Sequence, residues 1–158
     1  MTLRTPPPPV LASARVVAYA YVDDVPYNKW GALYAGAALI EAVPHLAIAI
    51  NLGKDVDALL FHRDSEWEVL GTSGGPTIDE AKLRAERNYP GVAKRWIDLN
   101  TTVDEALRYY DETSGALRCS FCGKRSFEIT GLVEGKGVAI CRGCVEDFYQ
   151  GFHEPGDP

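Results

Sequence analysis

All four cysteines of the chain fall in one pattern, in which two CxxC pairs are separated by eighteen residues. The pairs are Cys119 with Cys122 and Cys141 with Cys144. Thiolates at this spacing are typical of a tetrahedral zinc site, because the short turn within each pair brings two sulfurs to the same ion. Two disulfides or four ordinary buried thiols are alternative interpretations, and iron can replace zinc in such a site. The pattern favours one zinc ion held by the four cysteines.

Four sulfur ligands close the coordination shell of zinc and leave no position for water or substrate. A catalytic zinc ion ordinarily has three protein ligands and one exchangeable position. The sequence therefore predicts a structural Zn²⁺ whose binding is coupled to the folding of a small domain, and it speaks against metal-assisted hydrolysis.

The residues around the cysteines predict the elements that position them. Gly123 follows the first pair and permits the turn of a zinc knuckle. Residues Ser126–Thr130 and Gly137–Ile140 are predicted to form the two strands of a hairpin. From Cys144 onward, apolar residues recur at helical spacing. Knuckle, hairpin and helix in this order predict a small treble-clef zinc domain.

The two cysteine segments also resemble a known family. Cys-Ser-Phe-Cys-Gly-Lys at 119–124, followed by Ile-Cys-x-x-Cys-Val at 140–145, is similar to the zinc-binding domain at the front of the ClpX protein unfoldase. The resemblance covers about Leu117–His153. It implies that the four cysteines are the metal ligands, and that the module dimerises, docks partner or unfolded segments and carries no catalysis. A possible interaction face consists of Phe121, Phe127, Leu132 and Phe148.

The rest of the chain departs from that family. The unfoldase carries an ATPase, but no P-loop is found in this sequence. The nearest segment, Gly131–Gly137, has one residue too few between its glycines and lacks the Ser or Thr that would hold magnesium. This segment is predicted to be the hairpin turn, and the protein is not expected to be an unfoldase.

The residues before the module predict an α+β domain, an antiparallel sheet covered by helices in the order β-α-β-β-β-α-β-α. The expected strands are Ala14–Val22, His45–Leu52, Val56–His62, Trp67–Gly71 and Val92–Leu99. One helix is expected at Lys29–Ala42. Two more follow capping boxes that open at Thr77 and at Thr102, and end at Pro90 and at about Glu112. Residues Thr72–Gly75 are expected to be a flexible loop.

These elements divide the chain into four predicted parts. They are a proline-rich mobile tail at 1–13, the α+β domain at 14–114, the ClpX-type C4 zinc-binding domain at 115–153 and a short tail at 154–158. The run Pro6–Pro9 favours an extended polyproline conformation. It could serve as a ligand for a proline-binding domain, but the evidence is compositional, so a tail is the preferred interpretation.

Composition and charge limit the classes of partner that the protein is expected to bind. The formal net charge is −6, with 46% hydrophobic and 24% charged residues, as in a soluble globular protein. Glu41, Pro44 and His45 interrupt the most apolar window, Trp30–Leu52, which argues against a membrane span. The start of the chain does not resemble an export signal, so a cytoplasmic location is expected. Basic residues near the cysteines are too few in an acidic chain to favour nucleic acid.

Three functions remain open. The first is a non-enzymatic interaction protein that forms a homodimer through its zinc domain, such as a bacterial adaptor of a protease system or an immunity-type protein that caps a toxin. The second is a small nucleic-acid-binding zinc protein. The third is an enzyme whose site lies in the α+β domain, built from His62 with Asp64 or Glu66. A histidine at a strand end is usually structural, so no catalytic residue is assigned.

Overall fold

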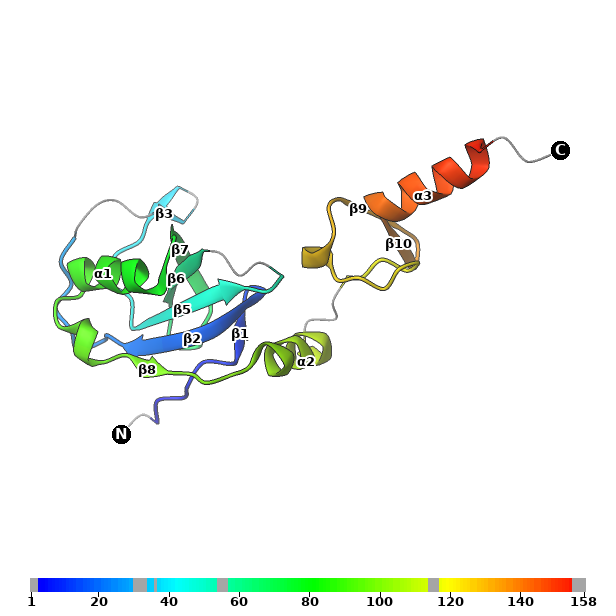
Figure 1. Ribbon diagram of the computed structural model, residues 1–158. Coiled ribbons are helices and arrows are strands. Elements are labelled where there is room, and N and C mark those ends of the chain that lie inside the picture. The colour runs from blue at the N-terminus through cyan, green and yellow to red at the C-terminus, as the bar shows by residue number, and fades with distance from the viewer. Residues whose placement is uncertain (1–2, 30–33, 36, 54–56, 114–116, 155–158) are drawn as a thin grey trace. The chain divides into compact units, whose positions relative to one another are not determined.

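An antiparallel sheet forms the N-terminal part of the chain in the computed structural model (Figure 1). The structure describes residues 3–29, 34–35, 37–53, 57–113 and 117–154. The chain divides into two compact units, residues 1–109 and residues 110–158. None of the helices in the described ranges is long and apolar enough to cross a membrane.

The sheet of the N-terminal unit has the order β1-β2-β5-β6-β7, and β8 also pairs with β2. All of its pairings are antiparallel. The strands are β1 (Val10–Leu11), β2 (Ala14–Tyr21), β5 (His45–Asn51), β6 (Ala58–Arg63), β7 (Val69–Gly75) and β8 (Ile97–Asp98). The sheet and the helices of the chain confirm the predicted α+β class, and the structure supports the main strands of the sequence analysis.

The helices of this unit follow their predicted caps. α1 (Ile78–Asn88) begins after Thr77, whose Oγ1 accepts a hydrogen bond of 3.1 Å from the backbone N–H of Glu80. α2 (Val103–Thr113) begins after Thr102, which exchanges hydrogen bonds with Glu105 in a capping box. Both predicted helix starts are therefore confirmed.

The helix predicted at Lys29–Ala42 is wrong in the part that the structure describes. Strands β3 (Tyr34–Ala35) and β4 (Ala38–Leu39) form a small antiparallel hairpin there, while residues 30–33 and 36 lie outside the described residues. The segment contains Gly31 and Gly36, and glycine has a poor helix propensity that offsets the apolar periodicity.

Two further predictions need correction. Residues Thr72–Gly75 belong to β7 and pair with β6, where Gly74 lies opposite Leu59, so they are not a free loop. The strand predicted at Val92–Leu99 is a short 3₁₀ turn, η1 (Val92–Lys94), followed by the two residues of β8. In Thr72–Gly75 and in β8, the pairing with a distant strand decides the conformation over the local pattern.

A bulge in β2 changes which residues of this strand point to each face of the sheet. The bulge lies between Val16 and Ala18, so the strand shifts by one residue there. Side chains alternate along a strand, and an extra residue moves the later ones to the opposite face. Val16 and Tyr19 consequently lie in one buried cluster, whereas Ala18 lies in the other.

The two faces of the sheet are covered differently. α1 lies over one face (Figure 1) and buries Ala81 and Ala85 in the first cluster. On the other face, Leu11 and Trp67 complete the second cluster, and the backbone of Thr5 accepts a hydrogen bond from Trp67. The N-terminal segment therefore packs against the sheet, which differs from the predicted mobile tail.

The C-terminal unit contains the predicted order of knuckle, hairpin and helix. Its elements are η2 (Ser126–Glu128), β9 (Leu132–Gly135), β10 (Val138–Cys141) and α3 (Arg142–His153). The hairpin strands differ from the prediction, because Ser126–Thr130 begins with a 3₁₀ turn that is capped by Arg125 and Glu128. A two-residue turn joins β9 to β10, and its second residue, Gly137, has a φ of 76° that favours glycine.

Candidate metal centre

The four cysteine sulfurs converge on one point in the C-terminal unit. All four Sγ atoms lie within 4.8 Å of one another. The Sγ of Cys119 lies 3.7 Å from that of Cys144, and the Sγ of Cys122 lies 3.8 Å from that of Cys141. A tetrahedral Zn²⁺ with Zn–S bonds of about 2.3 Å separates its sulfurs by about 3.8 Å. Bonded disulfide sulfurs lie about 2 Å apart, so the cysteines are free thiols arranged as a metal site.

The first pair sits on the predicted knuckle turn. The backbone N–H of Gly123 donates to the carbonyl oxygen of Cys119 at 2.9 Å, and the N–H of Cys119 donates to Lys124 at 3.0 Å. Gly123 has a φ of 73°, which a side chain would strain. Ser120 ties this turn to β10, since its N–H donates to Ala139 and its hydroxyl accepts from the same residue.

The second pair sits at the start of α3. Cys141 is the N-cap residue of this helix, and its sulfur accepts a hydrogen bond from the N–H of Cys144 at 3.5 Å. The N–H of Cys141 in turn donates to the sulfur of Cys119 at 3.4 Å. A helix N-terminus carries partial positive charge, so this position stabilises thiolates.

The pKa values of the cysteine thiols are consistent with a site that holds a bound cation. Backbone N–H groups, that of Cys122 first, lower the pKa of Cys119 to about 6. Burial, together with the neighbouring thiols, raises the pKa of Cys144 to about 12. Four thiolates cannot gather without a compensating charge, and a divalent cation supplies it. The donor set therefore fits Zn²⁺, which these residues would hold in a closed shell.

The comparison with protein families agrees with this geometry. Residues 117–154 match the ClpX C4-type zinc finger. The four cysteines of this zinc finger are thus positioned to bind one zinc ion, as the spacing predicts. The family match does not extend into residues 1–116, and no solved structure matches the chain. The treble-clef arrangement stays a prediction.

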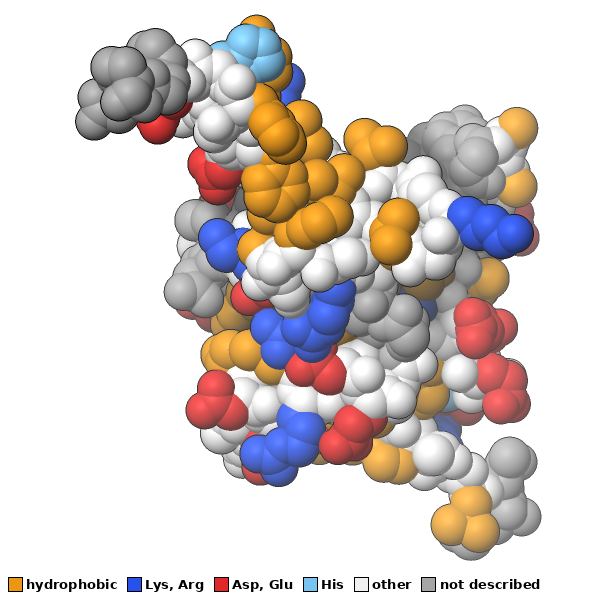
Figure 2. Space-filling view, turned by 90° about the vertical axis from the view of Figure 1, so that its right-hand side faces the viewer, with side chains coloured by type: hydrophobic (Ala, Val, Ile, Leu, Met, Phe, Trp, Pro, Cys, Tyr) orange, Lys and Arg blue, Asp and Glu red, His pale blue; other side chains and the backbone are white. Residues whose placement is uncertain are grey.

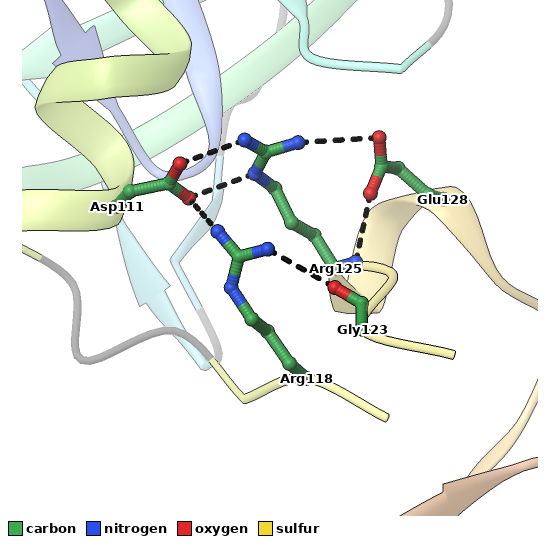
Figure 3. Close-up of polar contacts among 5 residues, drawn as sticks. All are labelled: Asp111, Arg118, Gly123, Arg125 and Glu128. Atoms are coloured by element: carbon green, nitrogen blue, oxygen red, sulfur yellow. Dashed lines mark hydrogen bonds and ion pairs between the residues drawn. The ribbon is translucent and has the colours of Figure 1, made fainter. Parts of the chain in front are cut away.

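A second feature of the zinc finger is an acidic side chain from α2 (Figure 3). The carboxylate of Asp111 accepts hydrogen bonds from Nε and Nη2 of Arg125 at 2.8 and 2.7 Å, and from Nη2 of Arg118 at 2.5 Å. Arg118 also donates to the carbonyl oxygen of Gly123, and Arg125 pairs with Glu128. Arg118 and Arg125 flank the knuckle and form a β-bridge, so Asp111 holds both ends of this turn.

The sequence predicts that the end of α2 belongs to the preceding domain. In the structure, Tyr110 and Asp111 belong to the same unit as the zinc finger, and the ring of Tyr110 contacts Phe127 at a centroid distance of 5.2 Å. The guanidinium groups of Arg118 and Arg125, which lie next to the first cysteine pair in sequence, are both paired with Asp111. A long-range ion pair of this kind leaves no signal in a single sequence.

Replacing Asp111 by asparagine is expected to loosen the knuckle and to speed zinc loss several-fold. The two guanidinium groups hold the pKa of this carboxyl at about 2, so it is ionised at neutral pH and both pairs are present. The rate of zinc transfer to a colorimetric chelator at neutral pH measures the effect. Glu112→Gln, with the same charge change one residue away, is the control. Equal transfer rates for the two variants would contradict a role of Asp111 in the knuckle.

The predicted interaction residues divide into two groups. Phe121 and Phe148 are exposed and lie against each other, with ring centroids 5.2 Å apart. Phe127 and Leu132 are half-buried instead. Three further exposed apolar residues, Val145, Tyr149 and Phe152, lie on α3. Together with Phe121 and Phe148 they form what we call the α3 face. The sequence signal for this face is the helical spacing of the apolar residues that follow Cys144.

The residues of the alternative enzyme site lie at the end of β6 and in the turn that follows it. His62 is buried, and burial lowers its pKa to about 4, so the ring is neutral. Asp64 caps the next turn instead, since its Oδ1 accepts from the N–H groups of Glu66 and Glu68. Within the described ranges, no hydrogen bond joins His62 to Asp64 or Glu66. Asp64 thereby supports the turn before β7.

Proposed function

We propose that the protein is a non-enzymatic interaction protein that forms a homodimer and docks a protein partner through its zinc finger. The observation that carries this proposal is the exposed α3 face. Tyr149 is 63% exposed and Phe152 is 87% exposed. Figure 2 shows hydrophobic side chains gathered near the top of the view, over the zinc finger.

The α3 face has the residue spacing of the apolar stripe that an amphipathic helix normally buries. Its helical members follow one another at i, i+3, i+4 and i+7, the spacing by which a helix packs against another surface. A contiguous exposed apolar patch commonly marks a protein interaction site, and aromatic side chains dominate binding energy at such sites. A second copy of the chain offers a self-complementary face of this kind, since dimers commonly pair identical surfaces.

The charges of the zinc finger favour protein over nucleic acid. Asp111 engages Arg118 and Arg125, and Arg142 lies 3.6 Å from Glu146. Cations that are paired with carboxylates contribute less to phosphate binding, which depends on unneutralised positive charge. The proposal includes a bacterial adaptor of a protease system and an immunity-type protein, since both act by binding another protein.

Replacing Phe148 by aspartate is expected to dissociate the dimer without loss of zinc. The variant places a charge in the centre of the α3 face, where association would have to bury it. Size-exclusion chromatography with light scattering measures the mass, and metal analysis measures the zinc. Val133→Asp, on an exposed position of β9, is the matched control. A wild-type chain that stays monomeric and captures no partner would contradict the proposal.

A further inference from the structure

The N-terminal segment of the chain is bound to the sheet by directional contacts. We call residues Arg4–Pro9 the strap. The indole Nε1–H of Trp67 donates to the carbonyl oxygen of Thr5 at 2.9 Å. The Nη2 of Arg4 donates to both carboxylate oxygens of Asp23, at 2.8 and 3.0 Å. The guanidinium of Arg4 also lies 5.0 Å above the ring of Tyr21.

The four prolines of the strap suit such a contact. Proline fixes φ and restricts the residue before it to extended conformations, so the segment pays little entropy on binding. Pro7 is buried, and the carbonyl oxygen of Pro9 accepts from the N–H of Val16 in β2 at 2.9 Å. The strap is thus an extended proline segment seated on the sheet.

The surface beneath the strap is aromatic. Tyr19 and Tyr21 project from β2 beyond its bulge, and Trp67 meets both, with ring centroids 5.8 and 6.1 Å away. Trp67 has a φ of 64°, which is unusual for a bulky residue. Arg63 holds this backbone in place by donating to the carbonyl oxygen of Trp67 at 3.0 Å. Strain that the surroundings maintain is often found where a side chain is presented for binding.

Two of these contacts are of the kind that suits recognition of a proline-rich peptide in an aromatic-lined groove. The indole N–H of Trp67 donates to a peptide carbonyl, and the carboxylate of Asp23 pairs with the arginine that flanks the prolines. From its composition alone, the proline run could be a ligand for another protein. In the structure the chain itself provides a receptor for it.

The strap leaves part of the groove open. A cavity of about 1160 Å³ is lined by the strap and, from the sheet side, by Asp23, His45, Glu66 and Trp67. The Nδ1 of His45 is buried without a hydrogen-bond partner among the described residues. An unpartnered buried nitrogen and free space beside the strap indicate a site that can hold more than this segment.

We propose that the groove lined by Asp23, His45 and Trp67, with Tyr21 beneath Arg4, binds arginine-anchored proline-rich segments of a partner protein, and that the strap occupies it in cis. The strap acts as a built-in competitor, because a tethered ligand has an effective concentration in the millimolar range. A partner segment must therefore displace it. This surface lies within residues 1–109 and is independent of the α3 face.

A labelled synthetic peptide with the sequence of residues 3–10 tests the proposal on the full-length chain. Arg4→Glu in the protein should release the strap and tighten peptide binding roughly tenfold or more, measured by fluorescence anisotropy, because the competitor is weakened. Arg84→Glu, which makes the same charge change on α1, should bind the peptide like the wild type. Equal affinity of the wild type and Arg4→Glu would overturn the proposal.

Two further measurements distinguish recognition by the groove from misfolding and from exchange of the strap between two copies of the chain. A peptide with glutamate in place of its arginine should bind Arg4→Ala weakly, and Asp23→Arg in that protein should restore its binding, because alanine at position 4 cannot form a new pair in cis. Trp67→Phe in the Arg4→Glu protein keeps an aromatic ring but removes the N–H donor, and it should weaken binding of the unaltered peptide while circular dichroism stays unchanged. Equal binding of both peptides would overturn the proposal. So would a dimer that persists in Phe148→Asp and is lost in Arg4→Glu, which would show that a second copy supplies the strap.

Discussion

Replacing Cys119 or Cys144 by serine is expected to unfold residues 117–153 and to leave the N-terminal unit folded. The zinc finger has almost no apolar core of its own. In the described part of the C-terminal unit, the buried hydrophobic residues are Tyr110, Cys119, Ala139 and Cys141, and two of these are metal ligands. Zinc binding in small modules supplies about 10–16 kcal/mol that is in effect the free energy of folding. A serine hydroxyl cannot replace a thiolate in this role.

Metal analysis and hydrogen exchange measure this effect together. Zinc should fall from one ion per chain to none, and amide protection should be lost in residues 117–153 but kept in the sheet. A strong chelator added to the wild type should give the same pattern. Val133→Ser, at an exposed position of the same module, is the control and should retain zinc. Loss of protection in the sheet as well would show that the two units fold as one.

The metal centre could be predicted from the sequence because its information is local. Two CxxC pairs define their own turns, and Gly123 adopts the positive φ that its identity suggests. The same is true of the helix starts, since Thr77 and Thr102 lie three residues from the acids that complete their caps. In each case the deciding contacts lie within a few residues of one another along the chain.

The features that could not be predicted depend on distant residues. The bulge after Val16 is settled by pairing with β5, and it decides which face Tyr19 and Tyr21 share. Asp111 meets Arg118 and Arg125 only after the knuckle has folded. A single sequence contains no sign of which acid pairs with which base.

The contacts of the strap also could not be predicted from the sequence. Its four prolines indicate an extended segment, but nothing in them indicates what the segment touches. Trp67 lies some sixty residues away in sequence, and the fold alone brings its N–H to Thr5. A low-complexity segment therefore has a binding partner in the same chain that composition cannot reveal.

Truncating Tyr89 is expected to be the most damaging single change in the N-terminal unit. This residue ends α1, is 1% exposed, and packs its ring against Tyr27. Its hydroxyl oxygen accepts a hydrogen bond of 2.7 Å from the backbone N–H of Val43. Tyr89→Ala should cost about 3–5 kcal/mol, a large share of the stability of a small domain. Tyr89→Phe should cost about 1–3 kcal/mol, because the buried N–H of Val43 loses its acceptor. Urea unfolding monitored by tryptophan fluorescence measures both values.

The same tyrosine should make the N-terminal unit sensitive to alkali. Burial raises the pKa of Tyr89 to about 12, above the ordinary value of 10.0 that it has in the unfolded chain. A raised pKa in the folded state means that the fold favours the neutral phenol. Its contribution is therefore complete below pH 10 and is lost as the pH rises from 10 toward 12. Stability curves of the wild type and of Tyr89→Phe should converge over this range, whereas Tyr149→Phe, at an exposed tyrosine, should follow the wild type. A constant difference between wild type and Tyr89→Phe across this interval would contradict the burial of a neutral phenol.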